Sequence, residues 1–205
     1  MIQQGARREF RQSPRTRLRR HKERGSYDRE LVHSILDEGL VAHVAVATAM
    51  GPRVVPMMYA REGDVLYLHG APANDVLTTA SGGVEVCVTV TLLDGLVLAK
   101  SAFNHSMNYR SVVAYGFATE MTEPALTRHA LDVLVQRITP ERAGAVRSPS
   151  DVELRRTRVL ALPLIEVSAK VRSGGPIDAA DDVSLPVWSG VVPLRTVRGD
   201  PVAAD

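Results

Sequence analysis

The sequence predicts a mainly β protein, a closed antiparallel β-barrel with flanking helices, and two observations lead to this prediction. About six short apolar runs follow one another with turn signals between them. One helical pattern precedes these runs, and a second is inserted before the last of them. Hairpin-connected strands with helices in these positions cannot form alternating βαβ units, whereas they suit a closed barrel.

The first helix has clear end signals. Asp28 is a suitable N-cap, the apolar side chains through Glu38 fall on one face, and Gly39 follows the last turn. The small apolar run at 40–48 then predicts a strand buried on both faces, which ends at a turn beginning with Gly51. His43 interrupts this run, and we expect it to be a hydrogen-bonded core histidine.

Further strands are predicted at 53–60 and 65–69, and Pro56 marks an edge or a bulge in the first of them because proline cannot donate to a ladder. A loop or short helix covers 70–82. The dipeptide Asp94-Gly95 between two apolar runs predicts a tight hairpin turn. The pattern continues with a strand at 109–121, a helix at 124–138, a short helix and a last strand at 159–167.

Charge and composition divide the 205 residues into three predicted parts. Residues 1–26 form a flexible basic arm, since residues 7–24 hold nine lysines and arginines against two glutamates. Residues 27–170 form the barrel, and 171–205 an irregular coat anchored by Trp188. A nucleic-acid role for the arm is not expected, because no reading helix and few aromatic residues accompany it.

Several classes of protein are excluded by what the sequence lacks. No apolar run is long enough to span a membrane and no signal peptide is evident, so we expect a cytoplasmic protein. The single Cys87 lies in an apolar strand pattern, which indicates a core residue, and no metal site is expected. Phosphate-binding loops and the nucleophile-elbow and zinc-protease motifs are absent.

Polar side chains concentrate between Asp94 and Gly116, where the donors could line a pocket for an anionic or heteroaromatic ligand or could satisfy their own loop. Lys100 and Arg110 are the cations best suited to a phosphate or carboxylate. His69, at a strand end, and His105, inside the polar stretch, are candidate pocket residues.

Four segments in order carry a resemblance to a known family. They are Gly-Leu-Val-Ala-His-Val-Ala (39–45), Val-Val-Pro-Met-Met-Tyr-Ala (54–60), Leu-Tyr-Leu-His-Gly (66–70) and Asn-Tyr-Arg-Ser-Val-Val-Ala-Tyr-Gly (108–116). Across residues 27–170 the chain resembles the flavin-nucleotide-binding split-barrel proteins, most of all the nitroimidazole-resistance branch, which is related to pyridoxamine 5′-phosphate oxidase.

The resemblance implies a six-stranded antiparallel Greek-key barrel that forms a homodimer with FMN at the subunit interface. It implies an oxidoreductase acting on a small organic acceptor, with His69 as the catalytic residue facing cofactor or reactant. With the cations Lys100 and Arg110 included, the candidate cofactor-binding residues are Arg53, Val54, Val55, Pro56, Met57, Met58, His69, Gly70, Lys100, Tyr109, Arg110, Ser111 and Lys170.

The sequence departs from this family where relatives carry a cation for the FMN phosphate, because Asn74 and Asp75 stand there. A like-charge contact at about 4 Å costs on the order of 1 to 4 kcal/mol, so another cation has to compensate or the cofactor is not FMN. Two alternatives therefore stay open. One is a non-catalytic protein that binds flavin or another cofactor, and the other is a haem-binding split barrel ligated by His43, His69 or His105.

Overall fold

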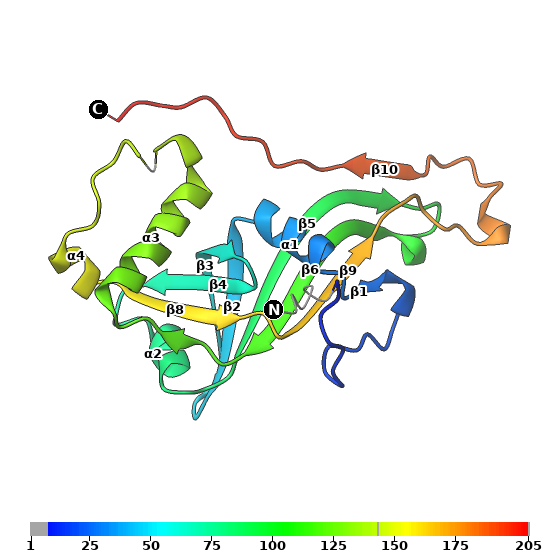
Figure 1. Ribbon diagram of the computed structural model, residues 1–205. Helices are drawn as coiled ribbons and strands as arrows, with labels where there is room; N and C mark the ends of the chain where they lie inside the picture. Colours follow the sequence, from blue (N-terminus) through cyan, green and yellow to red (C-terminus); the bar gives the residue numbers. More distant parts are fainter. Residues whose placement is uncertain (1–7, 143, 205) are drawn as a thin grey trace. The chain divides into compact units, whose positions relative to one another are not determined.

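The computed structural model describes residues 8–142 and 144–204. Figure 1 shows its strands and helices. The strands are β1 (Gly25–Ser26), β2 (Val41–Thr48), β3 (Gly51–Glu62), β4 (Val65–Gly70), β5 (Val86–Leu98), β6 (Ser106–Gly116), β7 (Thr119–Glu120), β8 (Arg158–Pro163), β9 (Glu166–Arg172) and β10 (Gly190–Pro193). The helices are α1 (Arg29–Glu38), α2 (Asp75–Ser81), α3 (Pro124–Ile138) and α4 (Asp151–Arg155), with 3-10 turns at η1 (Lys22–Arg24), η2 (Ala102–Asn104), η3 (Pro140–Arg142) and η4 (Ala180–Asp182).

The chain divides into two compact units, which are described separately. The first comprises the described residues up to Thr91 together with Ser111–Lys170. The second comprises Leu92–Arg110 together with the described residues from Val171 onward. The domain boundaries predicted at residues 26 and 170 stay a prediction.

The first unit is built on an antiparallel sheet with the strand order β1-β9-β6-β5-β2-β3-β4-β8-β7. Ladders such as β2–β3, from Val41↔Met58 to Thr48↔Gly51, and β4–β8, from Val65↔Pro163 to Gly70↔Arg158, are antiparallel. The predicted mainly β class with flanking helices is therefore confirmed.

The helix α1 begins and ends where the sequence predicts. The Asp28 carboxylate accepts a hydrogen bond from the Leu31 backbone N–H at 2.9 Å, and Ile35 and Leu36 are buried. Gly39 follows the helix, but its φ of −69° is not left-handed. A Cβ at this position would lie 2.4 Å from Val90 Cγ1, so glycine is required here by close packing.

The helix α3 covers one part of the sheet. Ala130 and Leu134 pack with Ala60, Tyr67 and Val159 in a buried cluster. The buried face of α3 is not purely apolar, since Leu126 near its start is exposed whereas Thr127 is buried. Thr127 tolerates burial because its hydroxyl donates to the Met121 and Glu123 carbonyls at 2.8 and 3.0 Å.

The strand β2 is buried on one face only, which corrects the prediction of two buried faces. Ala42, Val44 and Val46 are buried, whereas Val41 is 49% exposed and His43 is also exposed. The expectation of a core histidine at position 43 is therefore wrong. The apolar side chains on the second face made the run look fully buried, because hydropathy does not distinguish a core face from an uncovered one.

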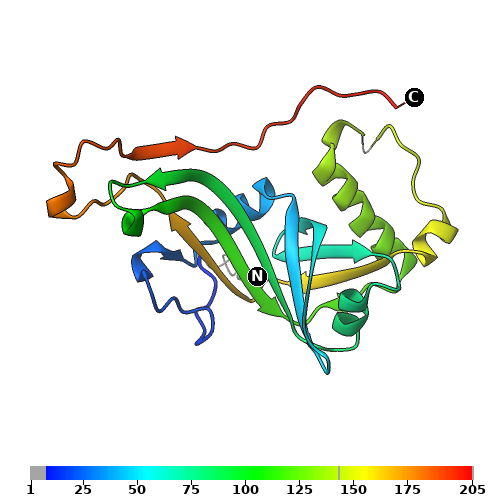
Figure 2. The same ribbon diagram turned by 180° about the vertical axis from the view of Figure 1, so that it is seen from behind.

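The predicted hairpin turn at Asp94-Gly95 is also wrong. The strand β5 continues through both residues, and the turn to β6 comes at η2 instead. Figures 1 and 2 draw β5 as one long unbroken arrow. Gly95 pairs with Pro193 of β10. A Cβ at Gly95 would lie 3.0 Å from both Val191 Cγ1 and the Val192 carbonyl oxygen, so the glycine permits close approach of β10.

The strand predicted at 159–167 is two strands. The strand β8 ends at Pro163 and β9 begins at Glu166. Proline ends the β8 ladder because it has no backbone N–H. The Leu164 N–H donates instead to the Asp64 carbonyl at 2.7 Å.

Residues 8–26 pack on the first unit, whereas the sequence predicts a flexible arm; Arg7 and the residues before it lie outside the described residues. Phe10 is 4% exposed and Thr16 is 2% exposed. The strand β1 pairs with β9 through Gly25↔Lys170 and Ser26↔Ala169. Composition did not predict this packing because a few anchoring contacts hold the otherwise polar segment.

In the second unit, residues after Val171 are held by hydrogen bonds and by the short β10 ladder. Lys100 Nζ donates to the Val183 and Leu185 carbonyls at 2.5 and 2.8 Å. Trp188 is 62% exposed and therefore does not serve as the expected buried anchor. No helix in residues 8–142 and 144–204 is long and apolar enough to cross a membrane.

Candidate functional site

The first half of β3 has one open backbone edge. Residues from Gly51 to Met58 pair with β2, and only Tyr59–Glu62 pair with β4. On the side away from β2, the segment Gly51–Met58 therefore has no strand partner in the part of the chain that the structure describes. Backbone N–H and C=O groups at such an edge can bind the polar rim of a planar ligand.

This open edge contains the predicted cofactor segment Arg53–Met58. Val54 is 58% exposed and Pro56 is exposed, whereas Val55 and Met57 are half-buried. Pro56 lies opposite His43 in the β2–β3 register. The proline therefore sits in the half of the strand that lacks a second partner, as its missing N–H requires.

His69, near the end of β4, is adjacent to this edge. Burial holds the pKa of the His69 imidazole below its usual value, although a hydrogen bond with the Met58 backbone acts in the opposite direction. The Nδ1 atom is buried and has no hydrogen-bond partner among the residues that the structure describes. A buried ring nitrogen that lacks a partner is unfavourable, so this side chain is a candidate for a change of rotamer when a polar ligand binds at the adjacent edge.

The next residue, Gly70, allows α2 to pack closely against β4. A Cβ at Gly70 would lie 2.9 Å from Leu77 Cδ1. The helix begins at Asp75, and the Asn74 side chain caps it by accepting from the Val76 and Leu77 N–H groups at 3.0 and 3.2 Å. Asn74 is thus used structurally at a position where the family resemblance led us to expect a cation.

Asp75 is paired within the chain. Arg53 Nη1 donates to Asp75 Oδ2 at 3.0 Å, and the two side chains are 41% and 70% exposed. The carboxylate therefore neutralises the arginine at the start of the predicted cofactor segment. Sequence reasoning missed this pair because 22 positions separate the two residues.

Lys100 and Arg110, in the second unit, are both engaged. The Lys100 ammonium binds the carbonyls of residues 183 and 185. Arg110 makes a two-point ion pair with Asp94, Nε to Oδ2 at 2.9 Å and Nη2 to Oδ1 at 2.7 Å. Both predicted phosphate cations thus have partners within the second unit.

The remaining predicted residues are half-buried. Tyr109 lies in the second unit, whereas Ser111 and Lys170 lie in the first, where the Ser111 hydroxyl donates to the Lys170 carbonyl at 3.4 Å. No hydrogen bond or ion pair engages the Lys170 ammonium among residues 8–142 and 144–204. Lys170 is therefore the one predicted cation that is still available to an anion within the described chain.

One ring nitrogen of the exposed His105 is engaged by the backbone of its own loop. Its Nδ1 lies 2.8 Å from the Ser101 carbonyl oxygen, and a ring that donates through Nδ1 directs the lone pair of Nε2 outward. The flanking side chains are apolar and uncovered, with Phe103 94% and Met107 50% exposed. No group of three or more His, Cys, Asp or Glu residues is arranged to hold a metal ion within the described ranges.

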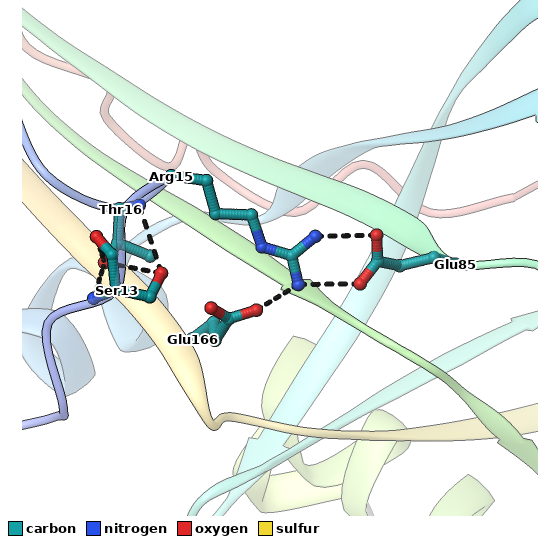
Figure 3. A network of polar contacts seen from close by, with 5 residues as sticks. All are labelled: Ser13, Arg15, Thr16, Glu85 and Glu166. Carbon is teal, nitrogen blue, oxygen red and sulfur yellow. Dashed lines mark hydrogen bonds and ion pairs between the residues drawn. The ribbon is translucent and has the colours of Figure 1, made fainter.

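A polar network missed by the sequence analysis connects the N-terminal segment to the sheet (Figure 3). Arg15 donates to both Glu85 oxygens at 2.6 Å and forms an ion pair with Glu166. Its guanidinium also lies 4.7 Å from the centroid of the Tyr115 ring. The hydrogen bonds from Arg15 hold the pKa of Glu85 below its usual range. A hydrogen bond with Ser13, followed by the one from Arg15, lowers the pKa of Glu166.

Cys87 is half-buried, and burial raises the pKa of its thiol. The thiol is thus kept protonated and is a weak nucleophile. This environment agrees with a structural role for the residue.

The antiparallel sheet with its flanking helices is that of a mainly β protein, and the family match identifies the fold as a split barrel. The chain belongs to the pyridoxamine 5′-phosphate oxidase family, whose family model matches residues 28–171. No match was found among the curated proteins.

The chain is similar to several solved structures, of which three are described here. It is 36% identical to the flavocytochrome Anf3 of Azotobacter vinelandii, covering 94% of this chain and 89% of that one, with a TM-score of 0.88. An FAD- and haem-binding protein from Mycobacterium smegmatis is 35% identical, covering 88% and 89%, with a TM-score of 0.85. A Bacteroides thetaiotaomicron protein ascribed to 5-nitroimidazole antibiotic resistance is 28% identical, covering 72% and 86%, with a TM-score of 0.60. The expected nitroimidazole-resistance branch is thus the least similar of the three.

Proposed function

We propose that this protein binds both a flavin and a haem and transfers electrons between them. The observation that carries the proposal is the open edge of Arg53–Met58 beside the orphaned Nδ1 of His69. The likeness to a flavocytochrome and to an FAD- and haem-binding protein over nearly the whole chain supports it. When bound, a flavin supplies hydride or single-electron transfer, and a haem supplies single-electron transfer.

For the flavin, FAD is a better proposal than the FMN expected from the sequence. The cation that would hold an FMN phosphate after β4 is absent, and Arg53 is neutralised by Asp75. FAD has a second phosphate and an adenosine that can make further contacts with the protein. The absence of one phosphate-binding cation therefore weakens FAD binding less than FMN binding. The backbone of Arg53–Met58 would bind the flavin ring, and Lys170 would be available to a phosphate.

His69 would contact the flavin or its reactant. Because burial lowers the pKa of the imidazole, the ring is neutral near pH 7 and can donate one hydrogen bond and accept another. If the flavin reduces a small organic acceptor, His69 would orient that acceptor. A protein that binds its cofactors without turning over a substrate would use the same contact only for affinity.

His105 is the residue that would hold the haem iron. Its Nδ1 contact with the Ser101 carbonyl fixes the ring, and the exposed Phe103 and Met107 side chains offer an apolar surface to the porphyrin. His43 is exposed and makes no side-chain hydrogen bond among the described residues, so it is the second candidate. His129 is bonded to Glu62 at 2.8 Å and is the natural control.

We also propose that the barrel is a closed six-stranded Greek key and that two copies form a homodimer. The uncovered apolar face of β2 and β3, with Val41 and Val54 49% and 58% exposed, supports the dimer. A second copy would bury this face and bring a second chain close to the open edge of β3. A small-molecule acceptor and a cytoplasmic location remain part of this proposal.

The absorption spectrum of freshly purified protein tests the two cofactors. We expect flavin bands together with an intense Soret band. The Soret band should be lost in His105→Ala and kept in His129→Ala, while the flavin bands should persist in both variants. A wild-type spectrum without a Soret band, even after haem is added, would reject haem binding. If added flavin also fails to raise the melting temperature, flavin binding is rejected as well.

Turnover distinguishes an oxidoreductase from a carrier. Steady oxidation of a reduced nicotinamide in the presence of a small acceptor would indicate an enzyme. Stoichiometric reduction of the bound flavin without further oxidation of the donor would indicate a protein that only holds its cofactor.

A further inference from the structure

The N-terminal segment forms a hollow of about 360 Å³ whose lining includes none of the residues proposed above to hold a cofactor. It is lined by Pro14, Arg17, Leu18, Arg19 and Lys22. Three cationic side chains thus surround a small depression whose other walls are apolar. A depression of this size matches the lower end of the range for small-ligand sites.

The cations of the hollow have no partner of their own. Among the described residues, no hydrogen bond or ion pair engages the side chains of Arg17, Arg19 and Lys22, and all three residues are exposed. Other cations of the same segment are paired, for example Arg8 with Asp28 and Arg15 with Glu85. The charge of the hollow is therefore left available, whereas Arg8 and Arg15 are used to hold the segment.

The segment is held in a defined conformation, which a ligand site requires. Arg15 is clamped between Glu85 and Glu166, as Figure 3 shows. In the adjacent turn the Ser13 N–H donates to the Thr16 hydroxyl at 2.8 Å, and the Tyr27 hydroxyl donates to the Thr16 carbonyl at 2.9 Å. These contacts flank Pro14, so the hollow is formed before any ligand arrives.

We propose that this hollow binds a ligand carrying a diphosphate group, such as the diphosphate of a nucleotide. Three cations around one depression match the two to three negative charges of a diphosphate, and arginine can bind each phosphate through two donors. Pro14 and Leu18 provide an apolar wall for the group attached to the diphosphate. A nucleic acid or an acidic protein would instead contact the whole basic segment, including Arg11 and Arg20, which lie outside the hollow.

Titration of inorganic pyrophosphate into the purified full-length protein tests this proposal by calorimetry at constant ionic strength. The variant Arg17→Gln/Arg19→Gln/Lys22→Gln should bind pyrophosphate at least about tenfold more weakly than wild type. The matched control Arg11→Gln/Arg20→Gln removes two exposed cations of the same segment. It should stay within about twofold of wild type, because the long-range charge effect is screened.

A second variant separates the shape of the hollow from its charge. Arg15→Gln leaves the three lining cations intact but removes the clamp, and we expect it to weaken pyrophosphate binding as well. Phosphorus NMR line broadening of pyrophosphate provides an independent measurement, and far-UV circular dichroism establishes that each variant compared is folded. Equal weakening in the control variant, or wild-type affinity for pyrophosphate no higher than for sulfate, would overturn the proposal. Tighter binding to single-stranded nucleic acid that depends equally on Arg11 and Arg20 would overturn it too.

Discussion

The Asp75 carboxylate, on the first residue of α2, lies 3.0 Å from the Nη1 atom of Arg53 on β3. The aspartate that the sequence places where a phosphate-binding cation is expected is thus the partner of another cation. Because both side chains are substantially exposed, the pair contributes only about 0 to 1 kcal/mol to stability. Its consequence is electrostatic, since it neutralises the first residue of the proposed flavin segment.

Replacing Asp75 by asparagine should free Arg53 for the cofactor. We expect Asp75→Asn to bind flavin about threefold to tenfold more tightly, with a melting temperature close to that of wild type. Fluorescence quenching of added flavin measures the affinity. Asp151→Asn is the control, because Asp151 is the first residue of α4 and forms an ion pair of similar exposure with Arg128. Weaker flavin binding in Asp75→Asn would show that Arg53 does not face the phosphate.

A methyl group at Gly95 should displace β10. The added Cβ would lie 3.0 Å from Val191 Cγ1 and from the Val192 carbonyl, and backbone cannot move aside as a flexible side chain can. We expect Gly95→Ala to lower the free energy of unfolding by roughly 1 to 3 kcal/mol and to speed proteolysis after residue 185. Gly175→Ala is the matched control, because a Cβ there meets no atom within 4 Å. A variant as resistant to proteolysis as wild type would show that β10 is not packed as described.

The helix α1 and the dipeptide Asp94-Gly95 show what local sequence patterns can and cannot predict. The helix α1 was predicted correctly because its signals are local, a capping aspartate and an apolar face within eleven residues. The hairpin turn predicted at Asp94-Gly95 is wrong because both residues interact with distant parts of the chain. The Asp94 carboxylate binds Arg110, and the missing side chain of Gly95 lets β10 pack closely. The Arg15 clamp joins residues up to 151 positions apart, so no local pattern could indicate it.

The candidate site was predicted in the same uneven way. The open edge of Arg53–Met58 was anticipated because Pro56 carries a local signal. The partners of Lys100 and Arg110 were not predicted. Many carboxylates and carbonyls along the chain were possible partners, and the sequence does not distinguish among them. Ion pairs between long side chains depend on tertiary position, which hydropathy does not encode.

The pH dependence of stability should reflect the buried imidazole of His69. Its folded-state pKa lies below the unfolded value of about 6.5, so the unfolded chain binds the proton more tightly. The stability that neutral His69 provides is therefore complete above about pH 6.5 and is lost as the pH falls towards the lower folded-state pKa. Denaturant unfolding of wild type and His69→Gln between pH 8 and 5 measures this effect. We expect the stability difference, wild type minus variant, to decrease with falling pH, and a constant difference would contradict the assignment.

The exposed face of β2 and β3 should determine the oligomeric state. Val41 and Val54 are 49% and 58% exposed, and aspartate at either position would place a charge in an interface that excludes water. We expect Val41→Asp and Val54→Asp to be monomers by light scattering, with far-UV circular dichroism unchanged because neither side chain is in the core. Val152→Asp is the control, since Val152 is 55% exposed on α4 and lies outside this face. If both β-sheet variants keep the mass of the wild type, two copies do not meet through this face.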